Sequence, residues 1–173
     1  MKEKILKMLD DLGIVYQLLE HAPIMTMEEG LSIAKQLDIK PCKNLFLVDK
    51  QGKHYLLLLD GSKKFKAKIV SNQIGCSHLS FGTPEDLNAL LGTQPGAVSI
   101  LGLANDTENK VRLLIDKDVL AEEYIGCHPC SNAASIKFKV SDLLEVLLPH
   151  IGHPTFDKVD IGAGAYIKPM PKR

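Results

Sequence analysis

Two apolar segments on either side of a short polar turn constrain the fold of this chain more than any other feature. Residues 44–49 and 54–59 form these segments, and Lys50-Gln51-Gly52-Lys53 connects them. Apolar runs that flank a short turn containing glycine are typical of a β-hairpin. Residues 56–59 are all leucine, which indicates a strand that is covered on both faces. We therefore expect the second strand of the hairpin to lie inside the core.

Helical and extended patterns alternate along the rest of the chain. Apolar spacing predicts a helix over residues 2–12. Four later helices are expected to begin at the capping residues Thr26, Ser62, Thr83 and Ser141 and to end near residues 37, 71, 92 and 148. Thr26 and Glu29 match a capping box. The other expected elements are strands at residues 14–19, 79–81, 97–100, 111–115, 124–126 and 135–139, and a helical turn at 117–121.

The length of the chain, 173 residues, suits one domain with a single core. Short strands mixed with helices predict an α+β class for it. We assign residues 1–153 to this domain. Residues 154–173 lack a packing period and end in a segment rich in glycine and proline. They are expected to form a C-terminal tail, either disordered or docked on a neighbour.

Charge and hydropathy exclude several classes of protein. The formal net charge is zero, whereas a sequence-independent nucleic-acid binder is usually basic. We therefore expect no DNA binding, whereas binding to one end of an RNA molecule is compatible with a net charge of zero. No run approaches about 18 apolar residues, so no membrane span is expected. The first residues do not resemble a signal peptide, and four cysteines are too few for a disulfide scaffold, so the cytosol is the expected location.

The segment Cys127-His128-Pro129-Cys130 allows three interpretations. A redox pair would require a long helix directly after it, but a β-like run follows. A zinc site would need further ligands from Cys42, Cys76 or His78, and no second Cys-x-x-Cys is present. The favoured interpretation is that the cysteines are small buried fillers. The segment would then be a rigid turn that presents His128 and Asn132, with no metal bound.

A second segment, residues 92–103, combines three glycines with a proline and a serine among apolar residues. Such a segment bends tightly and lets a ligand approach the backbone. It contains no standard nucleophile or phosphate-binding motif. A cluster of lysines between residues 63 and 68 is either a solvated helix face or a local phosphate contact. The residues alone therefore indicate an α+β domain with one pocket.

Three segments together resemble the YbaK/prolyl-tRNA-synthetase-associated editing domain family. They are residues 42–47, 91–99 and 126–132, in the order and spacing of the family's signature blocks. The chain is most similar to the freestanding prolyl-tRNA editing branch. Further matches are His21-Ala22-Pro23, Asn105-Asp106 and Lys137-Phe138, and the resemblance covers about residues 1–150.

The resemblance implies a mixed, partly closed β-sheet surrounded by helices. It also implies a hydrolase that removes the amino acid from mischarged tRNA, here Ala-tRNA(Pro), without a cofactor. The expected partners are the acceptor end of tRNA and prolyl-tRNA synthetase. The implied site comprises catalytic Lys43, Gly96 and His128, and substrate-binding Gly92, Pro95, Ala97, Val98, Ser99 and Asn132. With a tRNA substrate, the local lysine cluster Lys63, Lys64, Lys66 and Lys68 becomes the candidate tRNA-binding group.

The sequence departs from the family pattern at two positions. Ile100 stands where a proline is expected, and Cys130 where an aliphatic residue is expected. Both changes are expected to reshape the pocket wall and with it the amino-acid preference. Cys-tRNA(Pro) or another small aminoacyl-tRNA is therefore an alternative substrate. Two further functions stay open, namely a non-catalytic aminoacyl-tRNA binding module and a thiol oxidoreductase that uses Cys127 and Cys130.

Overall fold

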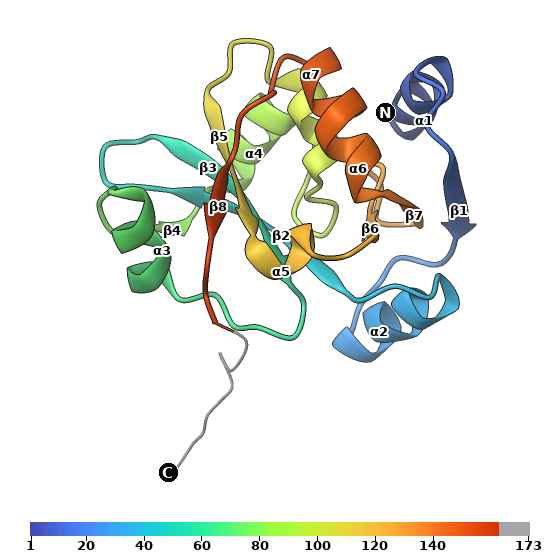
Figure 1. Cartoon of the computed structure of the whole chain (residues 1–173), viewed down its shortest axis with the longest axis horizontal. Helices are drawn as coiled ribbons and strands as arrows, with labels where there is room; N and C mark the ends of the chain where they lie inside the picture. The colour runs from blue at the N-terminus through green and yellow to red at the C-terminus, as the bar shows by residue number, and fades with distance from the viewer. Residues whose placement is uncertain (163–173) are drawn as a thin grey trace.

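Two β-sheets form the centre of the protein, and helices cover their outer faces (Figure 1). The computed structural model describes residues 1–162. The larger sheet has the order β4-β2-β3-β5-β8, and the smaller has the order β1-β7-β6. The strands are β1 (Tyr16–Glu20), β2 (Cys42–Val48), β3 (His54–Asp60), β4 (Ser80–Phe81), β5 (Val111–Asp116), β6 (Tyr124–Cys127), β7 (Ala134–Lys139) and β8 (Asp157–Val159). The predicted α+β class is confirmed, and the described strands form two open sheets rather than a closed barrel.

The predicted hairpin lies at the middle of the larger sheet. β2 and β3 pair antiparallel from Cys42↔Asp60 to Val48↔His54, and β5 adds to β3 in the parallel direction. The four leucines of β3 are fully buried. Leu56 and Leu58 pack in one apolar cluster, whereas Leu57 and Leu59 pack in another on the opposite face. Both faces of β3 are therefore covered, as the uninterrupted leucine run predicted.

Helices begin where the capping signals indicate in two cases. Thr26 and Glu29 form a complete capping box, and Thr83 accepts the Asp86 N–H ahead of Pro84. The helical segments are α1 (Lys2–Asp11), α2 (Met27–Gln36), α3 (Ala67–Ile74), α4 (Pro84–Leu91), a 3₁₀ segment (Ile100–Asn105), α5 (Lys117–Leu120), and α6 (Val140–Asp142), which continues through a π-helical turn (Leu143–Leu147) into α7 (Leu148–His150). No helix among residues 1–162 has both the length and the apolar character of a membrane span.

Other capping and extended signals were misleading. Ser62 does not cap a helix, because its hydroxyl and its N–H both donate to the Asp60 carboxylate in a turn, and α3 begins five residues later. The expected strand at 97–100 is absent. Ser99 instead caps the 3₁₀ segment by accepting the Leu101 N–H. Pro149 does not end the last helix, which continues from the π-helical turn Leu143–Leu147 to His150.

The C-terminal boundary also requires a correction. Asp157–Val159 forms β8, which pairs in parallel with β5 at the edge of the larger sheet. Val159 and Ile161 are buried in the second apolar cluster. The predicted tail of residues 154–173 is therefore wrong as far as residue 162. Residues 163–173 lie outside the described part of the chain.

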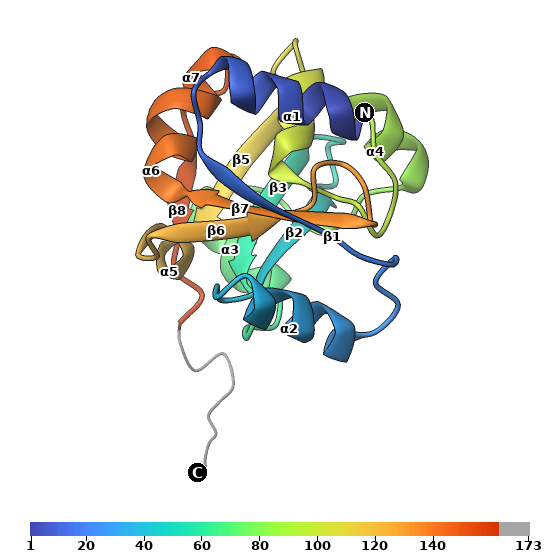
Figure 2. The ribbon, with the colours of Figure 1, turned by 90° about the vertical axis from the view of Figure 1, so that its right-hand side faces the viewer.

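The smaller sheet lies between α1 and α2 (Figure 2). β7 is its central strand and pairs antiparallel with β1 and with β6. α2 therefore faces this sheet on one side, and the start of β2 on the larger sheet lies nearby. Residues from both sheets and from α2 together line one cavity.

Candidate active site

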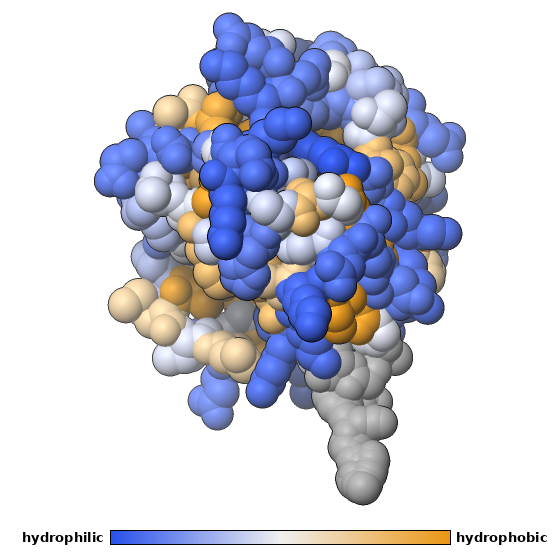
Figure 3. All heavy atoms as spheres, turned by 90° about the vertical axis from the view of Figure 1, so that its left-hand side faces the viewer, coloured by the Kyte–Doolittle hydropathy of each residue, from blue (hydrophilic) through white to orange (hydrophobic). Residues whose placement is uncertain are grey.

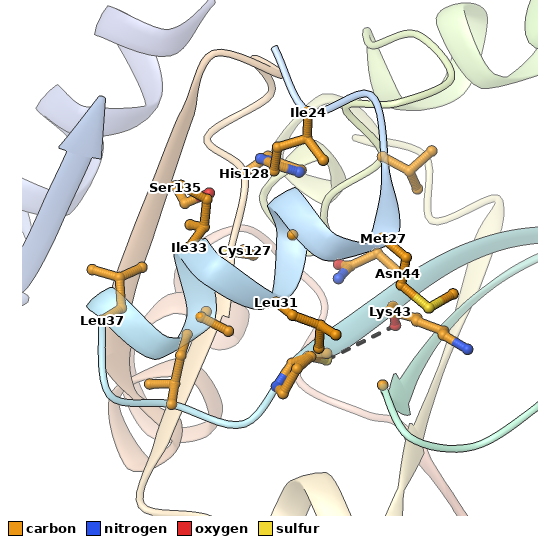
Figure 4. A pocket seen from close by; sticks show the side chains of 18 of the residues that line it. Ile24, Met27, Leu31, Ile33, Leu37, Lys43, Asn44, Cys127, His128 and Ser135 are labelled. Carbon is orange, nitrogen blue, oxygen red and sulfur yellow. Dashed lines mark hydrogen bonds between the residues drawn. The ribbon is translucent and has the colours of Figure 1, made fainter. Parts of the chain in front are cut away.

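A cavity of about 420 Å³ opens between α2, the first half of β2 and the β6–β7 region (Figure 4). Most of its surface is apolar. Its lining residues are Ile24, Thr26, Met27, Gly30, Leu31, Ile33, Ala34, Leu37, Ile39, Pro41, Cys42, Lys43, Asn44, Leu45, Gly61, Gly96, Val98, Gly126, Cys127, His128 and Ser135. Lys43, Gly96 and His128 thus face one hollow, as the resemblance implied, although their catalytic roles remain predictions.

The apolar stripe of α2 supplies one wall of the cavity. Met27, Leu31, Ala34 and Leu37 recur at helical spacing and line the cavity together. Ala34 and Leu37 are buried, whereas Met27 and Leu31 are exposed at 77% and 50%. The stripe therefore passes from the core to the mouth of the cavity and gives the entrance an apolar rim.

Lys43 is the second residue of β2, and its ammonium is anchored by the backbone. Its Nζ donates a 2.7 Å hydrogen bond to the carbonyl oxygen of Lys63, in the loop between β3 and α3. An ammonium group has three donors, so two remain for a ligand. The next residue, Asn44, accepts the Ile100 N–H at 2.8 Å through Oδ1 and ties β2 to the glycine-rich segment. Asn44 belongs to one of the family blocks but was not predicted to be a site residue.

The glycine-rich segment forms a tight loop whose tip reaches the cavity. Thr93 Oγ1 donates to the Ala97 carbonyl, and the Ala97 N–H donates to the Gln94 carbonyl. Gly96 has φ +92°, which strongly favours glycine. Among the described residues, the N–H groups of Gly96 and Val98 have no hydrogen-bond acceptor. Two backbone donors next to the cavity are therefore free to bind a ligand.

Several predicted substrate-binding residues do not line the cavity. Gly92 ends α4 in a left-handed conformation, and Ser99 is fully buried beneath the loop. Asn132 is exposed on the β6–β7 connection. Pro95 and Ala97 also lie outside the lining. Of the six residues predicted to bind substrate, Val98 alone is placed on the cavity wall.

The two departures from the family pattern lie behind the cavity wall. Ile100 is fully buried in the main apolar cluster, and Cys130 packs against the same cluster. Neither side chain lines the cavity. The expected reshaping of the wall by these two residues is therefore not a direct contact with the ligand space.

His128 presents an unprotonated nitrogen. Its Nδ1 lies 2.8 Å from the carbonyl oxygen of Ala134, and because a carbonyl can only accept, Nδ1 carries the proton. Burial lowers the pKa of His128 below its ordinary value. The imidazole is therefore neutral at pH 7, and Nε2 is a hydrogen-bond acceptor.

A second histidine and a serine complete this end of the site. His21 Nε2 lies 2.9 Å from Ser135 Oγ, and the ring centroids of His21 and His128 are 6.2 Å apart. Ser135 lies on β7 and lines the cavity. Neither was predicted as a site residue, because 114 positions separate them. The only available signal was the family match at His21-Ala22-Pro23.

The thiols have the protonated character of buried cysteines. Burial raises the pKa of Cys42 to about 12 and that of Cys130 to about 11, and it raises the pKa of Cys127 as well. The thiolate that a redox pair requires is therefore disfavoured. Among residues 1–162, no group of three or more histidine, cysteine or acidic side chains is arranged to hold a metal ion.

The predicted tRNA-binding lysines divide into two groups. Lys63 is 2% exposed, and its ammonium lies 2.9 Å from Asp116 Oδ1 and 2.6 Å from Asp118 Oδ2. Its assignment to RNA binding is therefore wrong, because the ammonium is enclosed by carboxylates. Lys64, Lys66 and Lys68 are exposed on or next to α3. The face that carries α3 is mostly hydrophilic, with small separate apolar patches (Figure 3).

Comparisons with known proteins agree with this arrangement. The model of the aminoacyl-tRNA editing domain family matches residues 21–146. The chain is 34% identical to a prolyl-tRNA editing protein of Acetoanaerobium sticklandii, over 84% of this chain and 90% of the relative. It is 28% identical to prolyl-tRNA synthetase associated domain-containing protein 1 of Danio rerio, over 85% and 81%.

A solved structure of a candidate trans-editing enzyme for prolyl-tRNA synthetase superposes with a TM-score of 0.68. It is 18% identical, and the match covers 92% of this chain and 94% of that chain. At this identity the likeness concerns the fold. The family model and the bacterial relative show the family as well as the fold. The chain therefore belongs to the aminoacyl-tRNA editing domain family, and the predicted enzyme class, an aminoacyl-tRNA hydrolase, is confirmed with it.

Proposed function

We propose that this protein is a trans-editing deacylase that hydrolyses the ester bond of Ala-tRNA(Pro). The observation that carries the proposal is the shared cavity of Lys43, Gly96 and His128, which combines a cation, free backbone donors and a neutral acceptor within an apolar enclosure. The bacterial relative named as a prolyl-tRNA editing protein supports the tRNA(Pro) part of the proposal.

The need for such an enzyme is physical. A synthetase pocket that holds proline cannot strongly exclude the smaller alanine, because the lost methylenes contribute only about 1–3 kcal/mol of discrimination. A second site that admits alanine and excludes proline corrects the error. The apolar wall formed by α2 suits a methyl side chain, and its exposed rim suits the terminal base of the tRNA.

The reaction is the addition of water across the ester. The water oxygen bonds to the carbonyl carbon, the bond from that carbon to the ribose oxygen breaks, and the second water proton ends on the ribose oxygen. In this proposal the N–H groups of Gly96 and Val98, which have no acceptor among the described residues and belong to the cavity lining, donate to the oxyanion that forms in between. The neighbouring ribose hydroxyl orients the water, so the mechanism requires no bound metal.

Lys43 contributes charge rather than a covalent bond. Its ammonium keeps one donor on the Lys63 carbonyl and directs the others to the terminal phosphate or the ester carbonyl. His128 shapes the opposite part of the cavity (Figure 4). The exposed Lys64, Lys66 and Lys68 hold the acceptor stem, so binding weakens moderately as salt rises. Prolyl-tRNA synthetase is the protein partner expected for this activity, and the cytosol is the expected location.

The test is a panel of mischarged tRNAs incubated with the purified protein, with release of the free amino acid as the readout. Fastest release from Ala-tRNA(Pro) supports the proposal. Preferential release from Cys-tRNA(Pro) or a serine ester would identify that ester, and not Ala-tRNA(Pro), as the substrate of the deacylase. Binding without release would make the protein a non-catalytic module.

Two controls test for a zinc enzyme and for a thiol enzyme. Addition of a chelator is expected to leave the rate unchanged, and a loss of activity would indicate a zinc enzyme. Replacement of both Cys127 and Cys130 by serine is expected to preserve deacylation. A variant that loses deacylation while folded would indicate that the thiols take part in the chemistry.

A further inference from the structure

The hydroxyl of Ser135 is held so that its oxygen can only accept hydrogen bonds from the cavity. His21 Nδ1 lies 2.8 Å from the Ala22 carbonyl oxygen, which fixes the proton of the neutral ring on Nδ1. His21 Nε2 is then an acceptor, and the Ser135 hydroxyl donates its hydrogen bond to this nitrogen at 2.9 Å. Ser135 is 6% exposed and lines the cavity. Its oxygen therefore offers lone pairs to a ligand and has no proton left to donate.

His128 offers a second acceptor at the same end. Its Nδ1 is occupied by the carbonyl of Ala134, the residue before Ser135, and its Nε2 carries a lone pair. Figure 4 places His128 and Ser135 at one end of the cavity, whereas the Lys43 side chain extends away from them. Two acceptors thus lie at the same end of the cavity, away from the cation.

The rest of the described lining offers no carboxylate to a cationic donor. None of the described residues that line the cavity is an aspartate or a glutamate. A buried acceptor without a donor is costly, so the ligand must supply N–H or O–H groups at this end. In an aminoacyl ester, the group with several donors next to the carbonyl is the α-amino group.

We propose that Ser135 and His128, with His21 as the residue that orients Ser135, form a subsite for the free α-amino group of the aminoacyl ester. The enzyme then accepts esters with an unblocked amine and excludes N-acylated esters such as peptidyl or acetylated aminoacyl-tRNA. An N-acyl group removes donors and adds bulk where the β6–β7 wall closes the cavity. This inference rests on the proposed deacylase function.

The test compares Ala-tRNA(Pro) with N-acetyl-Ala-tRNA(Pro) under single-turnover conditions. The wild-type protein is expected to hydrolyse the acetylated substrate at least about tenfold more slowly, as the loss of charge-assisted hydrogen bonds predicts. Equal rates on the two substrates would overturn the subsite while leaving the deacylase function intact. No hydrolysis of either substrate would instead refute the proposed function.

Variants identify the residues that carry the discrimination. Ser135→Ala is expected to slow hydrolysis of Ala-tRNA(Pro) about tenfold and to affect the acetylated substrate less. The ratio of the rate on Ala-tRNA(Pro) to the rate on N-acetyl-Ala-tRNA(Pro) therefore decreases. His21→Gln tests the orienting role from a partly exposed position and is expected to narrow the ratio in the same direction. Ser32→Ala, on the exposed face of α2, is the matched control and should preserve the ratio. If Ser135→Ala and His21→Gln, both shown to be folded by circular dichroism, slow the two substrates equally, the subsite is refuted.

Discussion

Lys43 donates a 2.7 Å hydrogen bond to the carbonyl oxygen of Lys63, a residue whose own ammonium is enclosed by Asp116 and Asp118. The contact joins two lysines with opposite surroundings. One faces the cavity, whereas the other is an internal ion-pair partner. The position of the cavity cation therefore depends on a loop that is fixed from inside the larger sheet.

Removal of the cavity cation is expected to abolish deacylation. Lys43→Ala should lower the single-turnover rate on Ala-tRNA(Pro) by about 100-fold or more, which is the scale for loss of one preorganised electrostatic contact in an active site. The protein should remain folded, because the Lys43 ammonium makes a single hydrogen bond within the described residues. Lys7→Ala, which removes an exposed lysine of α1 outside the cavity lining, is the control. Full activity of Lys43→Ala would exclude this residue from the mechanism.

A paired glycine experiment isolates the role of the loop backbone. Gly96 has φ +92° and Gly52, in the hairpin turn, has φ +85°, and an added Cβ would meet nothing within 4 Å at either position. Alanine at either site should destabilise the protein by a similar amount, about 1–3 kcal/mol, through backbone strain. Gly96→Ala should in addition slow deacylation about 10- to 100-fold by displacing the free N–H groups.

The comparison uses thermal unfolding for stability and single-turnover rates for activity. Gly52→Ala should retain the wild-type rate, because it lies outside the cavity lining. If Gly96→Ala also retained the wild-type rate, the loop would not supply the oxyanion donors.

Loss of the internal ammonium is expected to destabilise the fold. Lys63→Met leaves the fully buried Asp116 without its cation, and breaking a buried pair in this way costs about 3–5 kcal/mol. We expect the lower end of that range, because the N–H groups of Asp60 and Asp118 still donate to Asp116. Urea unfolding measures the change. Lys64→Met, an exposed neighbour, should be nearly neutral, and equal stability of the two variants would contradict the buried pair.

The dependence of activity on pH follows from His128. Burial lowers its pKa from the ordinary value near 6.5, so Nε2 should remain unprotonated as the pH falls to about 6.5. The rate should therefore decline only in more acidic solution. The single-turnover rate measured between about pH 5 and 8 tests this, and a half-maximal loss at or above pH 6.5 would contradict it.

The same shift has a consequence for stability. Below about pH 6.5 the unfolded chain binds a proton at this histidine that the folded protein does not bind, so the free energy of unfolding falls as the pH drops through that value. His128→Asn removes the titrating group and should flatten this part of the stability profile.

Sequence patterns predicted correctly those helices and strands whose signals lie within a few neighbouring residues. The leucines of β3 and the Thr26–Glu29 capping box gave correct elements, because their signals lie within a few residues of each other. Lys63 was misassigned because a lysine in a basic run is usually exposed, and the carboxylate that buries it lies 53 positions away. The pairing of His21 with Ser135 depends on the alignment of β1 with β7 and has no local signal.

Strand β8 was missed for a related reason. It has only three residues, too few for a period, and its burial comes from parallel pairing with β5 and packing of Val159. The family blocks placed Lys43, Gly96 and His128 correctly around one cavity, but they could not tell lining residues from residues that only shape the loop, such as Gly92 and Ser99.

The placement of β8 determines how the molecule tolerates shortening. A chain that stops at His153 would leave the backbone N–H and C=O groups along one side of β5 without partners. An open strand edge of this kind recruits strands from other molecules. The short segment after the last helix therefore protects this edge of the larger sheet from association with strands of other molecules.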